Sequence, residues 1–347
     1  MKLTSTWTEF TLVLVTLAVA FAVTGLMRHY AISRQLLDIP NARSSHSVPT
    51  PRGGGMGIVA AVLILAIGLP VLGLASLRDS LIYGACGGFV ALLGFLDDHG
   101  HVPAGWRLLG HFAAAIAAVV LAGGASDVVI FGRVVSLGWV GHAFAVLIVV
   151  WMLNLFNFMD GIDGLAGSEA VLVAGIGALL LSAFATPGSH IAWLVVVASG
   201  AGGFLLWNWP PARIFMGDAG SGFLGFALGI SPILAAKLAP EGFWIMLILP
   251  GVFVVDATVT LVRRVVRGMK PHVAHRTHGY QYLSRRWGGH RPVTMTYIAL
   301  TLLWCAPLAY AVARGALDGA AALLVAYTPL VGLAFLAKSG APERQEV

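Results

Sequence analysis

Asp97 and Asp98 are adjacent carboxylates at the end of a hydrophobic run. If that run is a helix, its dipole favours cations at this end, so two aspartates are mildly unfavourable there on their own. The pair could face a bound cation, or one member could act as a base toward the oxygen of an acceptor. The alternative is a solvated helix end without a chemical role.

A second polar segment contains Asn154, Asn157, Asp160 and Asp163, which recur every three residues. While the segment stays helical, residues at this spacing share one face. A polar face that enters a membrane is costly unless it meets polar partners or water. A glycine follows each aspartate, which indicates that the helix breaks there and leaves both carboxylates on a turn.

Asp218 lies between small residues just before a predicted helix, in the segment 215–221. At such a position the backbone can approach a phosphate closely, and free N–H groups point outward. A carboxylate beside a phosphate is favourable only with a divalent cation between them. Mg²⁺ is the natural choice, because it takes few protein oxygens and shares the phosphates of substrates.

The most basic loop contains His275, Arg276 and His278, which could bind a diphosphate together. Arg276 offers two-pronged contacts to phosphate oxygens. A histidine-rich stretch could also bind zinc, but no cysteine is near and Arg276 would repel a metal ion. The remaining alternative is a basic loop that serves only membrane topology and contact with anionic lipids.

Two further positions leave two explanations open. Arg52 precedes three glycines, which could form a turn around a phosphate or could only permit close helix packing. Asp256 lies inside a hydrophobic run, where a carboxylate is either functional or a buried hydrogen-bond partner for another helix.

The elements that position these groups are membrane helices. Of the 347 residues, 58% are hydrophobic and only 10% are charged, whereas soluble domains carry about 25% charged residues. The apolar residues form long runs, each near the roughly 20 residues that a helix needs to cross a bilayer. This excludes a soluble protein. Cys86 and Cys305 lie inside apolar runs, so we expect from them neither a disulfide nor a metal site.

Charged and turn-rich breaks divide the chain into eleven expected spans. They are 10–27, 55–74, 80–96, 107–122, 139–156, 171–186, 189–207, 222–238, 242–262, 293–313 and 319–337. The first is expected to be a retained helix, since no clear cleavage site follows it. The sixth and seventh are expected to join through the short turn Thr186-Pro187-Gly188. Without repeats or low-complexity linkers, we expect one all-α transmembrane catalytic domain over residues 1–347.

Most of the 21 Lys and Arg residues fall on one set of loops, which the positive-inside rule assigns to the cytoplasm. An odd number of spans then places the N-terminus in the periplasm and the C-terminus in the cytoplasm. The aspartates and the histidine segment fall on the same cytoplasmic side, where we expect the active site. The net charge of +6 therefore reflects topology and gives no reason to expect a nucleic-acid partner.

The aspartate pair, the segment 154–164, the segment 215–221 and the histidine segment occur in an order and at separations that resemble a known family. These are the polyprenyl-phosphate N-acetylhexosamine-1-phosphate transferases, and the resemblance covers about residues 25–292. It implies a multi-pass enzyme of the bacterial cytoplasmic (inner) membrane. Its donor would be a UDP-N-acetylhexosamine, its acceptor undecaprenyl phosphate and its by-product UMP, with Mg²⁺ as cofactor and Mn²⁺ as the alternative ion. The resemblance is compatible with a homodimer.

The resemblance also implies a role for each candidate residue. Asn157 and Asp218 would be the metal ligands. The catalytic group would comprise Asp97, Asp98, Asp160 and Arg276, with the aspartate pair handling the acceptor. The substrate-binding residues would be Phe215, stacked on uracil, Asp163 and Asn208 near the base, His275 and His278 at the diphosphate, and Arg52.

The segment 275–281 is similar to that of the O-antigen-initiating subgroup and lacks the consecutive histidines of the peptidoglycan branch. A 6-deoxy-N-acetylhexosamine, such as N-acetylfucosamine or N-acetylquinovosamine, is therefore the expected sugar, with N-acetylglucosamine as the alternative. The pathway would be O-antigen (lipopolysaccharide) or another cell-envelope polysaccharide.

Two rival functions are weaker. A cation-coupled secondary transporter places its polar groups near the bilayer midplane, whereas the carboxylates here gather on one side. A CDP-alcohol phosphatidyltransferase also uses aspartate-rich motifs, but its Asp-Gly-x-x-Ala-Arg sequence is absent after Asp160-Gly161.

Overall fold

The structure, a computed structural model, describes residues 2–40, 48–100, 102–184, 190–269 and 275–342. Within these residues the only strands form two short antiparallel pairs. These strands are β1 (Leu37–Asp38) with β2 (Thr50–Pro51), and β3 (Val128–Ile130) with β4 (Arg133–Val135). Helices make up the rest of the regular structure, so the expected all-α fold is confirmed.

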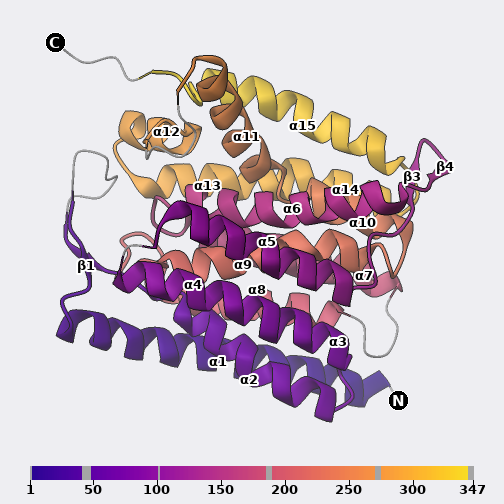
Figure 1. Ribbon diagram of the computed structural model, residues 1–347, viewed down its shortest axis with the longest axis horizontal. Helices are drawn as coiled ribbons and strands as arrows, with labels where there is room; N and C mark the ends of the chain where they lie inside the picture. Colours follow the sequence, from indigo (N-terminus) through magenta and orange to yellow (C-terminus); the bar gives the residue numbers. More distant parts are fainter. Residues whose placement is uncertain (1, 41–47, 101, 185–189, 270–274, 343–347) are drawn as a thin grey trace.

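Most helices run roughly parallel, so that their ends gather at two opposite ends of the bundle (Figure 1). The first half of the chain contributes α1 (Lys2–Ser33), α2 (Met56–Val71), α3 (Leu77–Ser80), a π-helix η1 (Leu81–Cys86), α4 (Gly87–His99), α5 (Ala104–Leu121), α6 (Gly138–Met159) and α7 (Leu165–Leu181). The second half contributes a 3₁₀ turn η2 (Ser182–Phe184), α8 (Ile191–Asn208), α9 (Asp218–Ala235), α10 (Pro240–Ile248), α11 (Gly251–Val266), α12 (Gly279–Trp287), α13 (His290–Leu300), a second π-helix η3 (Thr301–Cys305), α14 (Ala306–Ala313) and α15 (Gly319–Leu336).

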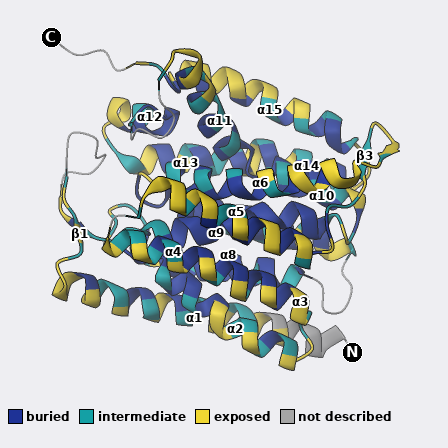
Figure 2. Ribbon diagram, in the orientation of Figure 1, coloured by how far each residue is buried: buried dark blue, intermediate teal, exposed yellow. Residues whose placement is uncertain are grey.

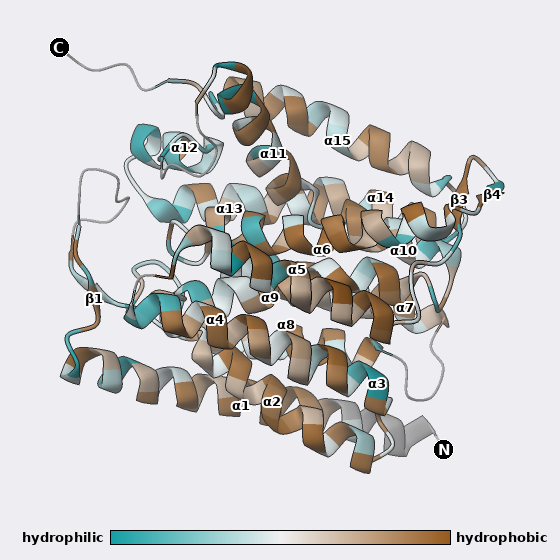
Figure 3. Cartoon of the chain, in the orientation of Figure 1, coloured by the Kyte–Doolittle hydropathy of each residue, from teal (hydrophilic) through white to brown (hydrophobic). Residues whose placement is uncertain are grey.

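We name the two ends of the bundle after their hairpins. The β1 end carries β1, β2 and α12, together with the start of α9 (Figure 1). The β3 end carries β3, β4 and the start of α3 (Figure 1). Figure 3 shows that the helices are hydrophobic along their middles, while hydrophilic residues collect toward the ends. The start of α1 and the end of α15 lie at opposite ends, as an odd number of crossings requires.

Nine helical segments of the described chain are long and apolar enough to cross a membrane, and the bent pair α10 and α11 makes a tenth. That pair bends by 64° at a break next to Pro250, and proline is a common cause of such kinks. Each of the eleven expected spans contains a helix. The helix in the second span, α2, has 16 residues and is shorter than the nine long apolar segments. The expected turn at 186–188 lies outside the described residues. The multi-pass membrane fold is confirmed.

Helix α9 forms the centre of the bundle. Every residue from Ala219 to Ala235 is buried, and Figure 2 shows α9 as one of the most continuously buried helices. It packs mainly against α6, α4 and α10. Small residues such as Gly225 and Gly229 let the α6 backbone approach closely. This packing fixes the position of Asp218, the first residue of α9, at the β1 end.

Candidate active site

Asp98, at the end of α4, accepts hydrogen bonds from the start of α9. The backbone N–H of Asp218 donates to Asp98 Oδ1 at 3.0 Å, and that of Ala219 donates to Oδ2 at 3.3 Å. The first N–H groups of a helix lack partners within the helix, and its dipole favours an anion there. The approach requires glycine at position 94, since a Cβ there would lie 2.4 Å from the Asp218 carbonyl oxygen. Asp98 therefore joins α4 to α9.

Arg52 forms an ion pair with the same carboxylate. Its Nε donates to Asp98 Oδ1 at 3.1 Å, and its terminal NH2 group contacts the same oxygen. Burial alone would lower the pKa of Arg52, but the carboxylates of Asp98 and Asp218 raise it above its ordinary value. The predicted substrate residue Arg52 is thus beside the predicted catalytic Asp98, and the guanidinium stays charged.

The glycines after Arg52 pack against the loop before α9. The N–H of Gly54 donates to the Phe215 carbonyl and that of Gly55 to the Met216 carbonyl, both at 2.9 Å. A Cβ on Gly55 would lie 2.4 Å from the Cα of Gly220. Of the two explanations left open by the sequence, the structure supports close packing for Gly54 and Gly55, because both of their N–H groups are used within the chain.

Arg107, near the start of α5, pairs with two carboxylates from different helices. Its NH1 group contacts Asp97 Oδ2 and lies 2.8 Å from Asp218 Oδ2. Asp97 also accepts from the backbone N–H of Val102 at 2.9 Å. Arg107 is not among the site residues predicted from the sequence. Arg107 is the first residue of the predicted span 107–122, ten positions after Asp97, and a cation that opens a span so close to a carboxylate pair was the signal that could have identified it.

Asn157 and Asp218, the predicted metal ligands, line one small cavity of about 40 Å³. Asn154, Arg107 and His111 line it as well, so the asparagines spaced three apart do share a face. The Asn157 amide donates to Ser221 Oγ at 3.3 Å, which links α6 to α9. The cavity is therefore bounded by side chains of α5, α6 and α9.

The donor types and the charge of this site fit Mg²⁺. Among the described residues, no three His, Cys, Asp or Glu side chains are grouped as a metal site. Mg²⁺, however, uses one or two protein carboxylates and completes its shell with water and substrate phosphates. The carboxylates of Asp97, Asp98 and Asp218 pair with only two guanidinium groups here, and the buried Asp160 lies near them; we call these four aspartates the carboxylate cluster. A divalent cation would balance the excess.

Asp160 lies at the end of α6, where the helix stops as predicted. Burial raises its pKa well above the ordinary range, and the charges of Asp218, Asp98 and Asp163 raise it further, whereas Arg52 lowers it. Asp160 thus lies close enough to the other aspartates of the carboxylate cluster for their charges to act on it. Its carboxyl retains a proton more readily than a solvent-exposed aspartate.

Asp163 and Asn208 hold two loops together. Asp163 Oδ2 accepts from the Ala212 N–H at 3.0 Å, and its Oδ1 lies 3.0 Å from His290 Nδ1. The Asn208 amide accepts from Gly164 N–H and donates to the Ile214 carbonyl, both at 2.9 Å. These contacts fix the loop after α6 beside the loop before α9. The proposed contacts of both residues with a base stay predictions.

Phe215 lies on the same loop and is half-buried. Its N–H donates to the Pro51 carbonyl at 2.8 Å, and its carbonyl accepts from Gly54. The backbone of Phe215 is therefore fixed beside Arg52. Its stacking on uracil stays a prediction.

Asp256 accepts five hydrogen bonds inside the protein. The donors are the N–H groups of Gly279 (2.8 Å) and Tyr280 (3.1 Å) and the hydroxyls of Tyr297 (2.7 Å), Ser339 (2.8 Å) and Thr260 (3.3 Å). Two of them are the first N–H groups of α12. Of the two explanations given by the sequence, Asp256 is the buried hydrogen-bond partner, and it anchors the helix that follows the histidine segment.

The histidine segment packs on the end of α6. The ring of His278 lies 4.9 Å from that of His275 and 6.0 Å from that of Phe158, measured between centroids. The Tyr280 hydroxyl donates to the Phe158 carbonyl at 2.8 Å. Because Phe158 follows Asn157 and lines the same cavity, His278 lies beside a residue of the cavity wall.

Burial keeps both histidines neutral. It lowers the pKa of His275 to about 3, helped by the neighbouring His278 and Arg264, and it also lowers that of His278. Arg276, between them, is half-buried, and its carbonyl accepts two hydrogen bonds from Arg285 at 3.2 Å. The positive charge at this point of the segment is therefore that of Arg276, while the two imidazoles can only hydrogen-bond.

The sequence of the chain is similar to those of known proteins. The profile of Glycosyl transferase family 4 matches residues 80–236. The chain is 31% identical to a Bacillus subtilis protein named "Probable undecaprenyl-phosphate N-acetylglucosaminyl 1-phosphate transferase", over 76% of this chain and 75% of that protein. It is 32% identical to the phospho-N-acetylmuramoyl-pentapeptide-transferase of Pelotomaculum thermopropionicum, over 86% and 96%. It is 28% identical to the decaprenyl-phosphate N-acetylglucosaminephosphotransferase of Mycolicibacterium smegmatis, over 88% and 82%.

Proposed function

The chain belongs to the polyprenyl-phosphate N-acetylhexosamine-1-phosphate transferases of glycosyl transferase family 4, and from this premise we propose the following reaction. A UDP-N-acetylhexosamine and undecaprenyl phosphate give undecaprenyl-diphospho-N-acetylhexosamine and UMP. The transfer of a sugar-1-phosphate to a polyprenyl phosphate follows from the relatives. The donor, the acceptor length and the cation are our proposal.

One observation carries the proposal. At the β1 end, Asp97 and Asp98 of α4 and Asp218 of α9 form ion pairs with Arg52 and Arg107, and Asp218 and Arg107 also line the small cavity beside Asn157. A site with excess negative charge can accept two phosphate-bearing substrates only if a cation joins it. Its place at one end of the helices also suits a lipid acceptor, whose phosphate lies at the headgroup level while its chain stays in the bilayer.

In the proposed reaction an oxygen of the acceptor phosphate bonds to the phosphorus that carries the sugar. The bond from this phosphorus to the bridging oxygen breaks, and UMP leaves with that oxygen and its electron pair. The acceptor phosphate is already anionic near neutral pH, so little base catalysis is needed. The main task of the protein is to bring two mutually repelling anions into line.

Asn157 and Asp218 would hold Mg²⁺, with Mn²⁺ as the alternative. When bound, the ion would offset phosphate repulsion and stabilise the charge that develops on the departing oxygen. Arg107 orients Asp218 toward the cavity, and Arg52 fixes Asp98 at the start of α9. These pairs keep the carboxylates in place before substrate arrives.

Arg276 would bind the donor diphosphate through its planar guanidinium, which can contact two oxygens at once. Neutral His275 and His278 would add hydrogen bonds without charge. Phe215, Asp163 and Asn208 would line the uracil side, and Asp97 with Asp98 would lie nearest the acceptor. Asp160, with its raised pKa, can donate a hydrogen bond to a phosphate oxygen while it is protonated.

We also propose the cellular setting. The β1 end would face the cytoplasm, which places the N-terminus in the periplasm and the C-terminus in the cytoplasm. The sugar would be a 6-deoxy-N-acetylhexosamine or N-acetylglucosamine, and the product would start an O-antigen or another cell-envelope polysaccharide. The segment 275–281 supports the O-antigen pathway by its resemblance to that subgroup.

The test is a panel of UDP-sugars assayed with purified protein, undecaprenyl phosphate and Mg²⁺. We expect a diphospho-lipid product and UMP from one or a few N-acetylhexosamine donors, and no product after chelation of the metal. If UDP is the main nucleotide released, the sugar carbon and not the phosphorus is attacked, and the proposed reaction is wrong.

A further inference from the structure

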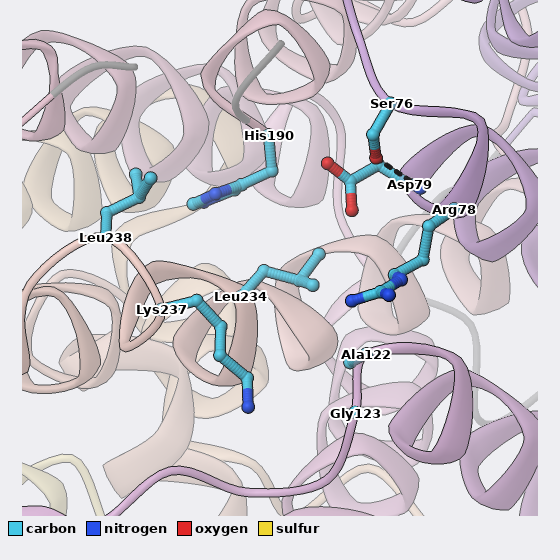
Figure 4. Close-up of a pocket in the computed structure, with 9 residues that line it drawn as sticks. All are labelled: Ser76, Arg78, Asp79, Ala122, Gly123, His190, Leu234, Lys237 and Leu238. Atoms are coloured by element: carbon cyan, nitrogen blue, oxygen red, sulfur yellow. Dashed lines mark hydrogen bonds between the residues drawn. The ribbon is translucent and has the colours of Figure 1, made fainter. Parts of the chain in front are cut away.

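The β3 end of the bundle contains a pocket of about 570 Å³ that the proposed reaction does not use. Small-molecule sites have volumes of roughly 300–1,000 Å³. Its walls come from the start of α3, the end of α5, the residue before α8 and the end of α9 (Figure 4). The 18 residues of α9 separate it by about 27 Å from Asp218. It is therefore a site distinct from the candidate active site.

Positive charge is concentrated at this pocket. Figure 4 shows Arg78 of α3 and Lys237, after α9, among the side chains that line it. Neither forms an ion pair within the described residues. Burial lowers the pKa of Lys237 and the charge of Arg78 lowers it further, so the two cations are close enough to repel each other. The buried carboxylate of Asp79 also lines the pocket and offsets only one of them.

His190 adds a buried polar nitrogen to the same space. Its side chain lines the pocket (Figure 4), it is 3% exposed, and its Nε2 has no hydrogen-bond partner among the described residues. Burial lowers its pKa to about 4, so the ring is neutral near pH 7. Buried polar atoms in proteins are nearly always paired. The unpaired Nε2 therefore leaves a hydrogen-bonding group of the pocket wall that no described residue uses.

These features define the ligand by its chemistry. Two cations beside a neutral imidazole suit a group with negative charge and several acceptor oxygens, and a guanidinium matches phosphate oxygens particularly well. The same pocket is lined by Leu234 and Leu238, which offer nothing to a free ion but can contact a glycerol backbone or the first methylenes of a chain. The helix ends at this side of a membrane protein also lie at headgroup depth.

We propose that the pocket at the β3 end binds the phosphate group of a membrane lipid headgroup, through Arg78, Lys237 and His190. Free inorganic phosphate shares this chemistry and is the second source that the experiment must distinguish. The two leucines favour the lipid. The site does not depend on the proposed transferase reaction.

The test compares the wild-type chain with the double variant R78Q/K237Q. The matched control is R133Q/R314Q, which removes two exposed cations at the same end but outside the pocket. Each full-length protein in neutral detergent is titrated with phosphatidylglycerol and, separately, with inorganic phosphate. Thermal unfolding and native mass spectrometry measure the binding. We expect the lipid to bind and stabilise the wild type and the control, and to bind R78Q/K237Q about tenfold more weakly or worse, as for the loss of charged hydrogen bonds.

Each remaining outcome decides between the sources or rejects the site. If inorganic phosphate alone stabilises the wild type fully and displaces the lipid, the pocket is a phosphate site filled from solution. If R78Q/K237Q binds both ligands like the wild type, or the control loses as much affinity, the pocket does not recognise phosphate and the proposal is wrong. Transferase activity in detergent, expected to be unchanged in R78Q/K237Q, shows that this variant is folded and separates the result from that of the proposed reaction.

Discussion

Replacing Asp256 by asparagine should loosen the start of α12 and with it the histidine segment that precedes this helix. In the wild type Oδ1 accepts from Gly279, Ser339 and Thr260, and Oδ2 accepts from Tyr280 and Tyr297. An asparagine can keep its oxygen on the first side only by turning its NH₂ group toward the second. The Tyr297 hydroxyl can rotate and accept from that group, but the N–H of Tyr280 cannot.

The expected loss of local stability follows from the hydrogen bonds that asparagine cannot make. One buried N–H loses its acceptor, and the remaining hydrogen bonds are no longer made to a charged group. A hydrogen bond to a charged group contributes about 1.5–3 kcal/mol, so we expect a loss of about 3 kcal/mol in the local stability of the start of α12. Arg276 and His278 lie immediately before α12. If they bind the donor, kcat/KM should fall by about tenfold to 100-fold, because misplaced groups no longer meet the diphosphate.

The matched control is Asp318→Asn. Asp318 also caps a helix, accepting from the N–H groups of Ala320 (2.9 Å) and Ala321 (3.1 Å), but it lies at the β3 end. Its replacement should cost about 0.5–1 kcal/mol and leave kcat/KM unchanged. The assay measures UMP release together with hydrogen exchange of residues 279–287. If Asp256→Asn loosens α12 and kcat/KM stays at the wild-type value, the histidine segment does not bind the donor and the reasoning fails.

Three further substitutions test the carboxylate cluster and the contacts with the donor. Asp218→Ala should abolish turnover in a protein that remains folded by thermal unfolding, because the cation loses its charged ligand; substantial Mg²⁺-dependent UMP release would contradict this. Arg276→Lys should lower both kcat and kcat/KM, the latter by about 100-fold, as for one preorganised charge-stabilising group. The exposed Arg286, changed to lysine, is its control, and equal losses at both positions would mean that only bulk charge matters. Arg107→Gln should reduce kcat/KM by about tenfold or more, because Asp97 and Asp218 lose their shared cation; an unchanged kcat/KM would show that this ion pair has no part in turnover.

The fold class and the candidate segments could be predicted from the sequence because they depend on local properties. Hydrophobic runs of bilayer length define membrane helices whatever their neighbours are. The polar segments stand out because polar groups are rare in such runs. The spacing of Asn154 and Asn157 gave their common face, and the glycines after Asp160 and Asp163 gave the end of the helix, since both features follow from helix geometry.

The contacts between distant segments could not be predicted in this way. Asp98 and Asp218 are 120 positions apart in the sequence, and nothing near either residue indicates that one caps the helix begun by the other. For Asp256 both explanations remained open, because its donors lie 4 to 83 positions away. Arg107 resembled any cation at a membrane boundary. Its role depends on the packing of α5 beside α4 and α9, which composition does not determine.

The ion pairs of Arg52 and Arg107 explain how the carboxylate cluster is stable without substrate. Asp98 is stabilised by Arg52 and by the first N–H groups of α9, so both of its oxygens already have partners within the protein. Asp218 is different, because its hydrogen bond from Arg107 involves Oδ2 in a side chain that also lines the cavity. A divalent cation bound in that cavity would compete with Arg107 for the same carboxylate. Arg107, already in contact with Asp97 and about one-third exposed, could then turn toward an incoming phosphate. The exchange would leave Asp98 paired with Arg52, and Asp218 paired with a positive charge, both before and after substrate binds.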